Sequence, residues 1–299
     1  MYTEVKQYMK LEGIGQESCM NRIDKKRYYK EKTLQELNLA DDFLFAKVMS
    51  DPIVCKKVLE KILGIQISKI TMPENQKIID LLLESKGIRL DVYVNDAEGT
   101  VYNVEMQQGE NINLAKRTRY YQGNIDLDMI QKGEDYRKLN KSFIIFICTF
   151  DPFNKERHMY TFKNVCLQDT SVILGDETEK IFLSTKGKVN DVDEEMLEFL
   201  AYIEHTTEQI AKMAESDLVR VLHKKVTAIK TDQRMEVEYM TLLERDREKI
   251  EIGREEGAKK EREKNVRNLM NAGVEIEKIA QAIGISKEEI ERIVEEHRQ

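Results

Sequence analysis

Tryptophan is absent from this 299-residue sequence, which also has only three prolines, four histidines and four cysteines. The cysteines stand singly, without a CxxC pair or histidines at ligand spacing, at Cys19, Cys55, Cys148 and Cys166. The sequence therefore favours neither a zinc site nor a disulfide framework. Cys148 lies in an apolar run, where we expect it to be a small buried hydrophobic residue.

Long hydrophobic runs and an excess of positive charge are missing as well. No apolar run approaches the roughly 20 residues of a membrane helix, and residues 1–10 lack the apolar core of a signal peptide. We expect a cytoplasmic protein with no membrane partner. The net charge is −7, so any contact with DNA has to come from a local basic patch.

A hydrophobic content of 41% is sufficient for a conventional core, and the pattern changes along the chain. Residues 1–35 are polar with a basic stretch, which predicts a mobile extension that is either solvated or in contact with DNA. Residues 42–49 predict a short amphipathic helix. Asp51 and Pro52 then predict a capped second helix that ends at Gly64.

Strand patterns follow, with a helical interruption. Residues 78–83, 88–94 and 101–107 are rich in β-branched and apolar side chains, and a loop at 95–99 predicts a hairpin between the last two. The pattern of residues 111–130 is helical. Further strands are expected at 143–150, 158–165 and 180–183, the first of them buried on both faces.

Helical patterns take over from Asp191, which with Glu194 predicts a capped helix start. The stretch 235–270 interleaves acids and bases almost evenly, which indicates an exposed or self-pairing helix. We divide the chain into an extension (1–35), a main domain (36–240), the charged helix (241–270) and a final segment (271–299).

The chemistry follows from strand alternation. Asp91 points away from the face of Leu90 and Val92, and Glu105 shares a face with Asn103 and Gln107. If Asn95 pairs with Val101, Asp91 lies directly opposite Glu105, with Cβ atoms about 4.5–5.5 Å apart.

Two carboxylates so placed repel each other, and a hard divalent cation such as Mg²⁺ offsets that repulsion. Gln107 could orient a water molecule or a phosphate oxygen. The alternative is that both acids are simply solvated on the surface of a hairpin.

The same segments resemble a known family. The sequences at 42–47, 87–92, 104–107 and 116–121 are similar, in order and spacing, to the recombination-promoting nuclease and transposase family of the PD-(D/E)XK superfamily. The similarity covers roughly residues 36–240.

This resemblance implies an α/β fold: a restriction-endonuclease-like core with a mixed sheet flanked by helices, followed here by an all-helical C-terminal region. It also implies metal-dependent hydrolysis of DNA phosphodiesters, with Asp91 and Glu105 as the acidic positions of the motif and as the metal ligands. Mg²⁺ is the expected cofactor, with Mn²⁺ as an alternative. Gln107 stands where the superfamily more often has lysine, which removes a cation that would help the transition state.

Other residues receive two interpretations each. Asp42 is either a further catalytic carboxylate or the N-cap of its helix. Lys116, Arg117 and Arg119 are candidate phosphate contacts, and Tyr120 and Tyr121 either stack on bases or pack against the sheet.

Residues 275–294 fit a helix-turn-helix pattern. Gly284 makes the turn, Ser286 and Glu289 form a capping box, and five isoleucines fill the core: Ile279, Ile283, Ile285, Ile290 and Ile293. Acids outnumber bases in the second helix, so self-association or packing competes with DNA recognition as its role.

Three functions remain open on the sequence alone. The first is a Mg²⁺-dependent DNA endonuclease linked to recombination or mobile DNA. The second is a non-catalytic DNA- or protein-binding module that acts through the C-terminal helices. The third is a structural subunit of a homo-oligomer assembled through the long charged helix.

Overall fold

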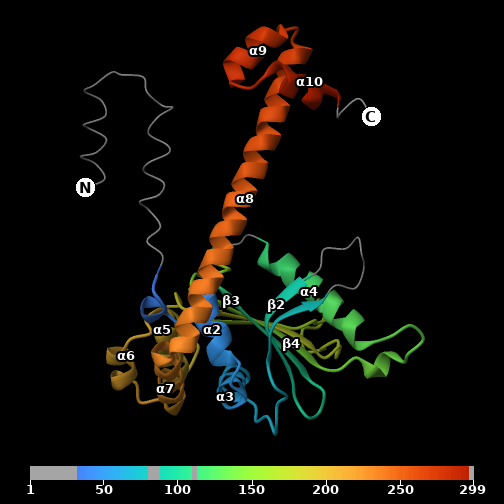
Figure 1. The fold of residues 1–299 in the computed structure, drawn as a ribbon. Helices are drawn as coiled ribbons and strands as arrows, with labels where there is room; N and C mark the ends of the chain where they lie inside the picture. Colours follow the sequence, from blue (N-terminus) through green and yellow to red (C-terminus); the bar gives the residue numbers. More distant parts are fainter. Residues whose placement is uncertain (1–31, 80–87, 110–112, 296–299) are drawn as a thin grey trace. The chain divides into compact units, whose positions relative to one another are not determined.

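The structure is a computed structural model that describes residues 32–79, 88–109 and 113–295. It forms two units, residues 1–231 and 232–299, each with its own set of internal contacts. The first unit contains a six-stranded mixed sheet with helices on both faces (Figure 1). Within the described residues, no helix is long and apolar enough to cross a membrane.

In chain order, the elements of the first unit are η1 (Leu34–Glu36), α2 (Asp42–Met49), α3 (Pro52–Leu63), β1 (Glu74–Ile79), β2 (Ile88–Asn95), β3 (Val101–Gln107), α4 (Leu114–Met129), η2 (Tyr136–Lys138), β4 (Ser142–Cys148), β5 (Met159–Phe162), β6 (Thr178–Ser184), α5 (Glu194–Glu204), α6 (Glu208–Met213) and α7 (Asp217–Thr231).

The sheet has the strand order β1-β2-β3-β4-β6-β5. β1, β2 and β3 pair antiparallel, β3, β4 and β6 pair parallel, and β5 adds an antiparallel edge. The helix α4 is the crossover between the parallel strands β3 and β4. It contacts β1 and β4 on one face, while α2 contacts β2 and packs with α7 (Figure 1).

Local sequence signals explain the helix ends. The Asp51 carboxylate accepts hydrogen bonds from the backbone N–H of Ile53 and of Val54, at 3.0 and 3.3 Å. Pro52 stands at the first helical position, and Gly64 ends α3 with φ of 64°. The predicted start and stop of α3 are therefore confirmed, because the capping residues act within one turn.

The buried strand β4 is fully enclosed, as its apolar run predicts, and Cys148 is 0% exposed. On the face covered by α4, the core includes Tyr121, Ile125, Phe146 and Phe182. The stacked rings of Tyr121 and Phe146, 6.3 Å apart, join the helix to the sheet.

Several predicted boundaries are wrong. β1 begins at Glu74, earlier than the predicted 78–83, and part of that prediction lies outside the described residues. The N-cap of α5 is Asp193, whose carboxylate accepts from the Met196 N–H at 2.9 Å. Asp191 instead accepts a hydrogen bond from the N–H of His158, because a tertiary contact outcompetes the local capping pattern. The predicted extension falls mainly on residues outside the described part of the chain.

The second unit consists of α8 (Gln233–Asn271), α9 (Ile276–Ile283) and α10 (Lys287–Glu295). Its small core consists of Val266, Ile279, Ile290 and Ile293. The partly buried Ile283 and Ile285 pack against this core. Gly284 adopts φ of 73° at the turn, and the Glu289 N–H donates to Ser286 Oγ at 3.2 Å. Two short helices joined at Gly284 thus occur where the sequence predicts a helix-turn-helix pattern.

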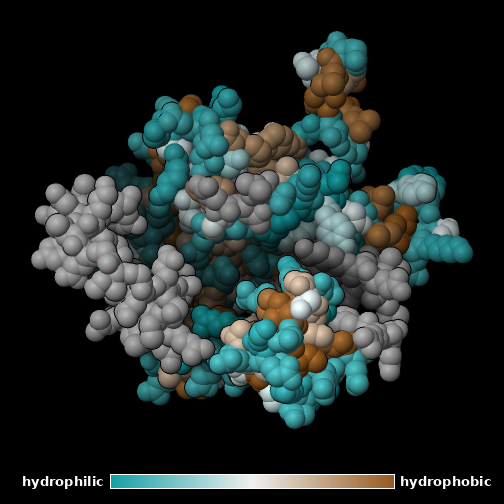
Figure 2. Space-filling view, turned by 90° about the horizontal axis from the view of Figure 1, so that it is seen from above, coloured by the Kyte–Doolittle hydropathy of each residue, from teal (hydrophilic) through white to brown (hydrophobic). Residues whose placement is uncertain are grey.

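The described surface is rich in polar groups, consistent with a charged content of 34%. The face in Figure 2 is mainly hydrophilic, and its hydrophobic patches are small and separate.

Candidate active site

The β2–β3 hairpin has the register that the sequence predicts, with Asn95 paired to Val101 and Val92 paired to Val104. Continuing this register along both strands places Asp91 opposite Glu105. Next to the Val92–Val104 pair, each of the two carboxylates accepts a hydrogen bond from a backbone N–H of the facing strand. The Glu105 carboxylate accepts from the Asp91 N–H at 3.1 Å, and the Asp91 carboxylate accepts from the Met106 N–H at 3.1 Å.

These two hydrogen bonds fix both carboxylates at the same point of the sheet. Each acid binds the backbone of the opposite strand, so neither side chain is free to turn into solvent. Glu105 is 1% exposed, whereas Asp91 is half-buried. The alternative of two solvated surface acids does not describe Glu105.

The electrostatics of Glu105 are unusual for a carboxyl group. Burial, reinforced by the negative charge of Asp91, raises the pKa of Glu105 to about 8. The Asp91 N–H, the Asn103 amide and the Arg117 guanidinium act in the opposite direction. A buried acid whose pKa is displaced by a second acid is typical of a functional site.

Arg117 joins the site from α4. Its Nη2 atom lies 3.1 Å from Glu105 Oε2 and 2.8 Å from the Tyr121 hydroxyl oxygen, and its Nη1 atom donates to Gln107 Oε1 at 2.7 Å. The guanidinium carbon also lies 5.2 Å from the centres of the Tyr121 and Phe146 rings. Arg117 is therefore held among Glu105, Gln107 and an aromatic wall.

The other predicted basic residues of α4 point elsewhere. Lys116, Arg119 and Tyr120 are exposed, while Tyr121 is buried against Phe146. The role of the exposed three as DNA contacts stays a prediction. The packing alternative therefore holds for Tyr121.

Asp42 is the first residue of α2 and is exposed; the N-cap is Asp41, so the capping alternative for Asp42 is wrong. Gln108, one residue beyond β3, donates to the Ala40 carbonyl at 2.7 Å and contacts Asp41 Oδ1 at 3.4 Å. This contact brings the start of α2 to the end of β3. The catalytic role of Asp42 stays a prediction.

Sequence reasoning missed two neighbours of the acids. Tyr121 holds Arg117 through its hydroxyl, and the spacing of four residues within one helix was the available signal. Asn103 is 0% exposed, and its amide lies close enough to Glu105 to lower the pKa of that carboxyl group, but neither amide atom makes a hydrogen bond of ordinary geometry among the described residues. Strand alternation places Asn103 on the face of Glu105, but nothing in the sequence marks it as unsatisfied.

The donor set fits a hard divalent cation. Asp91 and Glu105 supply carboxylate oxygens, and the unsatisfied Asn103 amide adds a polar group on the same face of β3. No group of three or more acidic, histidine or cysteine side chains at metal-binding distance occurs in the described ranges. Such a cation would therefore keep several water molecules, as Mg²⁺ commonly does.

Similarity to a known protein family covers most of the chain. A family model described as PD-(D/E)XK nuclease family transposase matches residues 40–261, more than half of the chain. The chain belongs to this family. In the same comparisons, no curated protein and no solved structure matched it. The family match confirms the predicted fold class, with its mixed sheet flanked by helices, and supports a nuclease-type function.

Proposed function

We propose that this PD-(D/E)XK family protein is a Mg²⁺-dependent endonuclease that hydrolyses phosphodiester bonds in DNA, in recombination or the movement of mobile DNA. The main support is the pair of hydrogen bonds that hold the Asp91 and Glu105 carboxylates on the backbone of the facing strands in the β2–β3 hairpin. Folding places two acids together at a cost, and a bound cation would offset that cost.

The two acids are the proposed metal ligands. A bound Mg²⁺ would polarise a phosphate oxygen and lower the pKa of an attacking water. Mn²⁺ suits the same carboxylate and water ligands. Asp42, brought close to the end of β3 through the Gln108 contacts, is proposed as an additional carboxylate.

Gln107 and Arg117 act as a pair in this proposal. Gln107 lacks the positive charge that lysine would bring, and the Arg117 guanidinium lies 2.7 Å from its amide oxygen. Arg117 therefore supplies a cation next to the position where the superfamily more often has lysine. This charge is oriented by Glu105 and Tyr121 before substrate binds, which favours stabilisation of the charge that develops on phosphate.

DNA is the proposed partner, approached through the exposed basic face of α4. Lys116 and Arg119 contact phosphates in this proposal, and Tyr120 stacks on a base or sugar. The local basic residues matter because the whole chain carries a net charge of −7.

The test is a metal-titrated cleavage assay on plasmid DNA. The wild type should nick or cut the plasmid with Mg²⁺ or Mn²⁺ and not with EDTA, and Asp91→Ala should abolish cleavage. Glu98→Ala, an exposed acid of the same hairpin loop, is the matched control and should cleave normally. Continued cleavage by a purified Asp91→Ala, Glu105→Ala double variant would exclude this site.

A further inference from the structure

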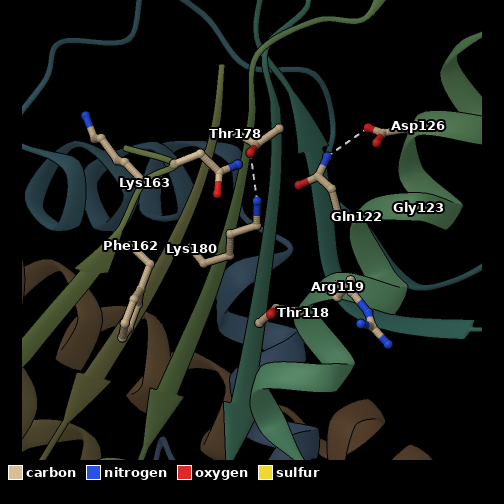
Figure 3. A pocket seen from close by; sticks show the side chains of 10 residues that line it. Thr118, Arg119, Gln122, Gly123, Asp126, Phe162, Lys163, Thr178 and Lys180 are labelled. Atoms are coloured by element: carbon tan, nitrogen blue, oxygen red, sulfur yellow. Dashed lines mark hydrogen bonds between the residues drawn. The ribbon is translucent and has the colours of Figure 1, made fainter. Parts of the chain in front are cut away.

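A second polar site is a cavity between α4 and the strands β5 and β6 (Figure 3). Its volume is about 550 Å³, within the range of small-molecule sites. Gln122, Gly123 and Asp126 line it from the helix, and Phe162 and Lys180 line it from the strands.

The strand side of this cavity offers an aromatic face beside a cation. Phe162 pairs with Lys180 across β5 and β6, and 45% of the Phe162 surface is exposed. The Lys180 ammonium donates to Thr178 Oγ1 at 2.7 Å, and no carboxylate in the described ranges lies within ion-pair distance of it. Burial lowers the pKa of Lys180, and the negative charges of Asp176 and Asp126 act in the opposite direction.

The helix side offers hydrogen-bond acceptors. The Asp126 carboxylate accepts from Gln122 Nε2 at 2.8 Å, and burial raises the pKa of Asp126. Asp126 and Lys180 influence each other electrostatically without forming an ion pair among the described residues. The cavity thus has a negatively charged acceptor, Asp126, on one wall and a positively charged donor, Lys180, on the other.

Gly123 borders the cavity without a side chain. It stands within α4, where glycine is unfavourable relative to alanine. A Cβ atom added at Gly123 would meet nothing within 4 Å, so no packing contact in the described structure requires glycine there. A larger side chain at this position would extend into the cavity.

This combination selects a ligand class. An isolated phosphate would meet the Asp126 carboxylate, and an amine would meet the Lys180 ammonium, so neither suits both walls. A nucleobase has a flat apolar face for Phe162 and both donors and acceptors on its edge. It is therefore complementary to all three side chains.

We propose that this cavity receives one unpaired nucleobase of a DNA strand, stacked on Phe162 with its edge between Asp126 and Lys180. The proposal rests on the proposed function only in taking DNA as the ligand. The exposed Arg119 also lines the cavity and carries no ion pair among the described residues, which leaves it available to a flanking phosphate. The protein would thus favour DNA that already contains an unpaired base, since extrusion from a duplex costs unpairing energy.

The experiment compares two DNA probes that differ by one base: a fully paired duplex and the same duplex with a single bulged 2-aminopurine. Binding of the full-length protein is measured by anisotropy in EDTA, so that cleavage does not interfere. We expect about tenfold tighter binding of the bulged probe, a factor within the range that stacking on an aromatic ring supplies. Equal binding of the two probes would overturn the proposal.

Two variants test the cavity itself. Gly123→Gln should fill it and Phe162→Ala should remove the stacking face, and each should bring the ratio of the two affinities close to one. Gly253→Gln on α8 is the matched control, because this helical glycine also has nothing within 4 Å of an added Cβ. An unchanged ratio in Gly123→Gln would refute the assignment.

Thermal unfolding separates binding from folding. Gly123→Ala should melt at a higher temperature than the wild type, because alanine favours the helix. Free dAMP distinguishes the source of the base: if it occupies the cavity while the bulge brings no preference, the site serves free nucleotides and the DNA assignment fails. Because binding is measured without metal, Asp91→Ala should keep the preference for the bulge even if the protein proves unable to cleave.

Discussion

At the scale of single residues, the site depends on how one buried carboxyl group is compensated. Glu105 is almost fully enclosed, and Arg117 is its cationic partner at 3.1 Å. Breaking such a pair from one side leaves a buried charge without a counter-ion, which is strongly unfavourable. In this chain the same contact also orients the guanidinium toward Gln107.

Arg117→Ala is expected to reduce cleavage by about 10²-fold or more, comparable to the loss of one preorganised charge-stabilising donor. It should also lower the melting temperature above about pH 8, where Glu105 is ionised and loses its counter-ion. Arg117→Lys should restore part of the activity, since it returns the charge without the forked geometry. Arg137→Ala is the control variant, because Arg137 is exposed and pairs only with Asp135 in the described structure. It should cleave like the wild type. Full activity in Arg117→Ala would remove Arg117 from the proposed mechanism.

The raised pKa of Glu105 predicts a pH dependence of stability in metal-free protein. The folded protein keeps the Glu105 proton up to about pH 8, whereas the unfolded chain releases it near the ordinary value of 4.5. The stability that this proton contributes is therefore complete below about pH 4.5 and is lost as the pH rises to about 8.

Glu105→Gln should remove the loss of stability that ionisation of Glu105 causes as the pH rises. The melting temperature of the variant minus that of the wild type should rise between pH 5 and pH 8, measured by circular dichroism in EDTA. A difference that stays constant over this window would contradict the burial-driven pKa shift.

At the scale of elements, α4 presents three different faces. Arg117 and Tyr121 turn toward the two acids, Gln122 and Asp126 turn toward the second cavity, and Lys116 remains exposed. One crossover helix can serve two sites because its residues advance around the axis by 3.6 per turn.

The exposed basic face of α4 leads to a prediction about salt. A Lys116→Ala, Arg119→Ala double variant should bind DNA more weakly, and the slope of log affinity against log salt should decrease by about two. Lys259→Ala, Lys260→Ala on α8 is the matched pair of exposed charges and should leave that slope unchanged. Equal slopes in wild type and the α4 variant would exclude phosphate contacts by these two residues.

The cap of α3 allows a prediction of stability. Asp51 caps the helix and forms an ion pair with Lys225 of α7 at 2.9 Å. Asp51→Ala loses both interactions and should cost about 1–2 kcal/mol, whereas Asp51→Asn keeps the cap and should cost less. Denaturant unfolding of both variants measures the difference, and equal losses would mean that the cap contributes little.

At the scale of the whole molecule, the two units have separate cores. Ile290 is 0% exposed in the small core of the second unit. Ile290→Ala should destabilise that unit by about 2–5 kcal/mol and leave unfolding of the first unit unchanged. Hydrogen exchange resolved by peptide would show whether loss of protection is confined to residues 232–295.

Removing residues 272–299 tests which unit acts on DNA. The proposed function expects the truncated protein to retain metal-dependent cleavage, because both acids and Arg117 belong to the first unit. If the full-length protein does not cleave DNA and the truncated protein no longer binds it, the chain is instead a binding module that acts through its C-terminal helices. Light scattering on the same pair of proteins reports whether these helices support self-association.

Much of the fold and the opposed acids could be predicted because they depend on local rules. Side-chain alternation has a period of two along a strand, so the short loop at 95–99 was enough to predict the pairing of Asn95 with Val101. Helix ends at Asp51 and Gly64 followed from capping residues within one turn. Capping at Asp191 failed because a contact with His158, distant in sequence, uses that carboxylate.

By itself, the sequence determined the hairpin, its two acids and the family motif, since neighbours along the chain set strand register and helix caps. Only the tertiary structure decided that Glu105 is buried, that Arg117 turns inward to Gln107, and that α4 and β6 enclose a second cavity. Burial and charge compensation depend on segments that are far apart in sequence, and no local pattern specifies which of them will meet.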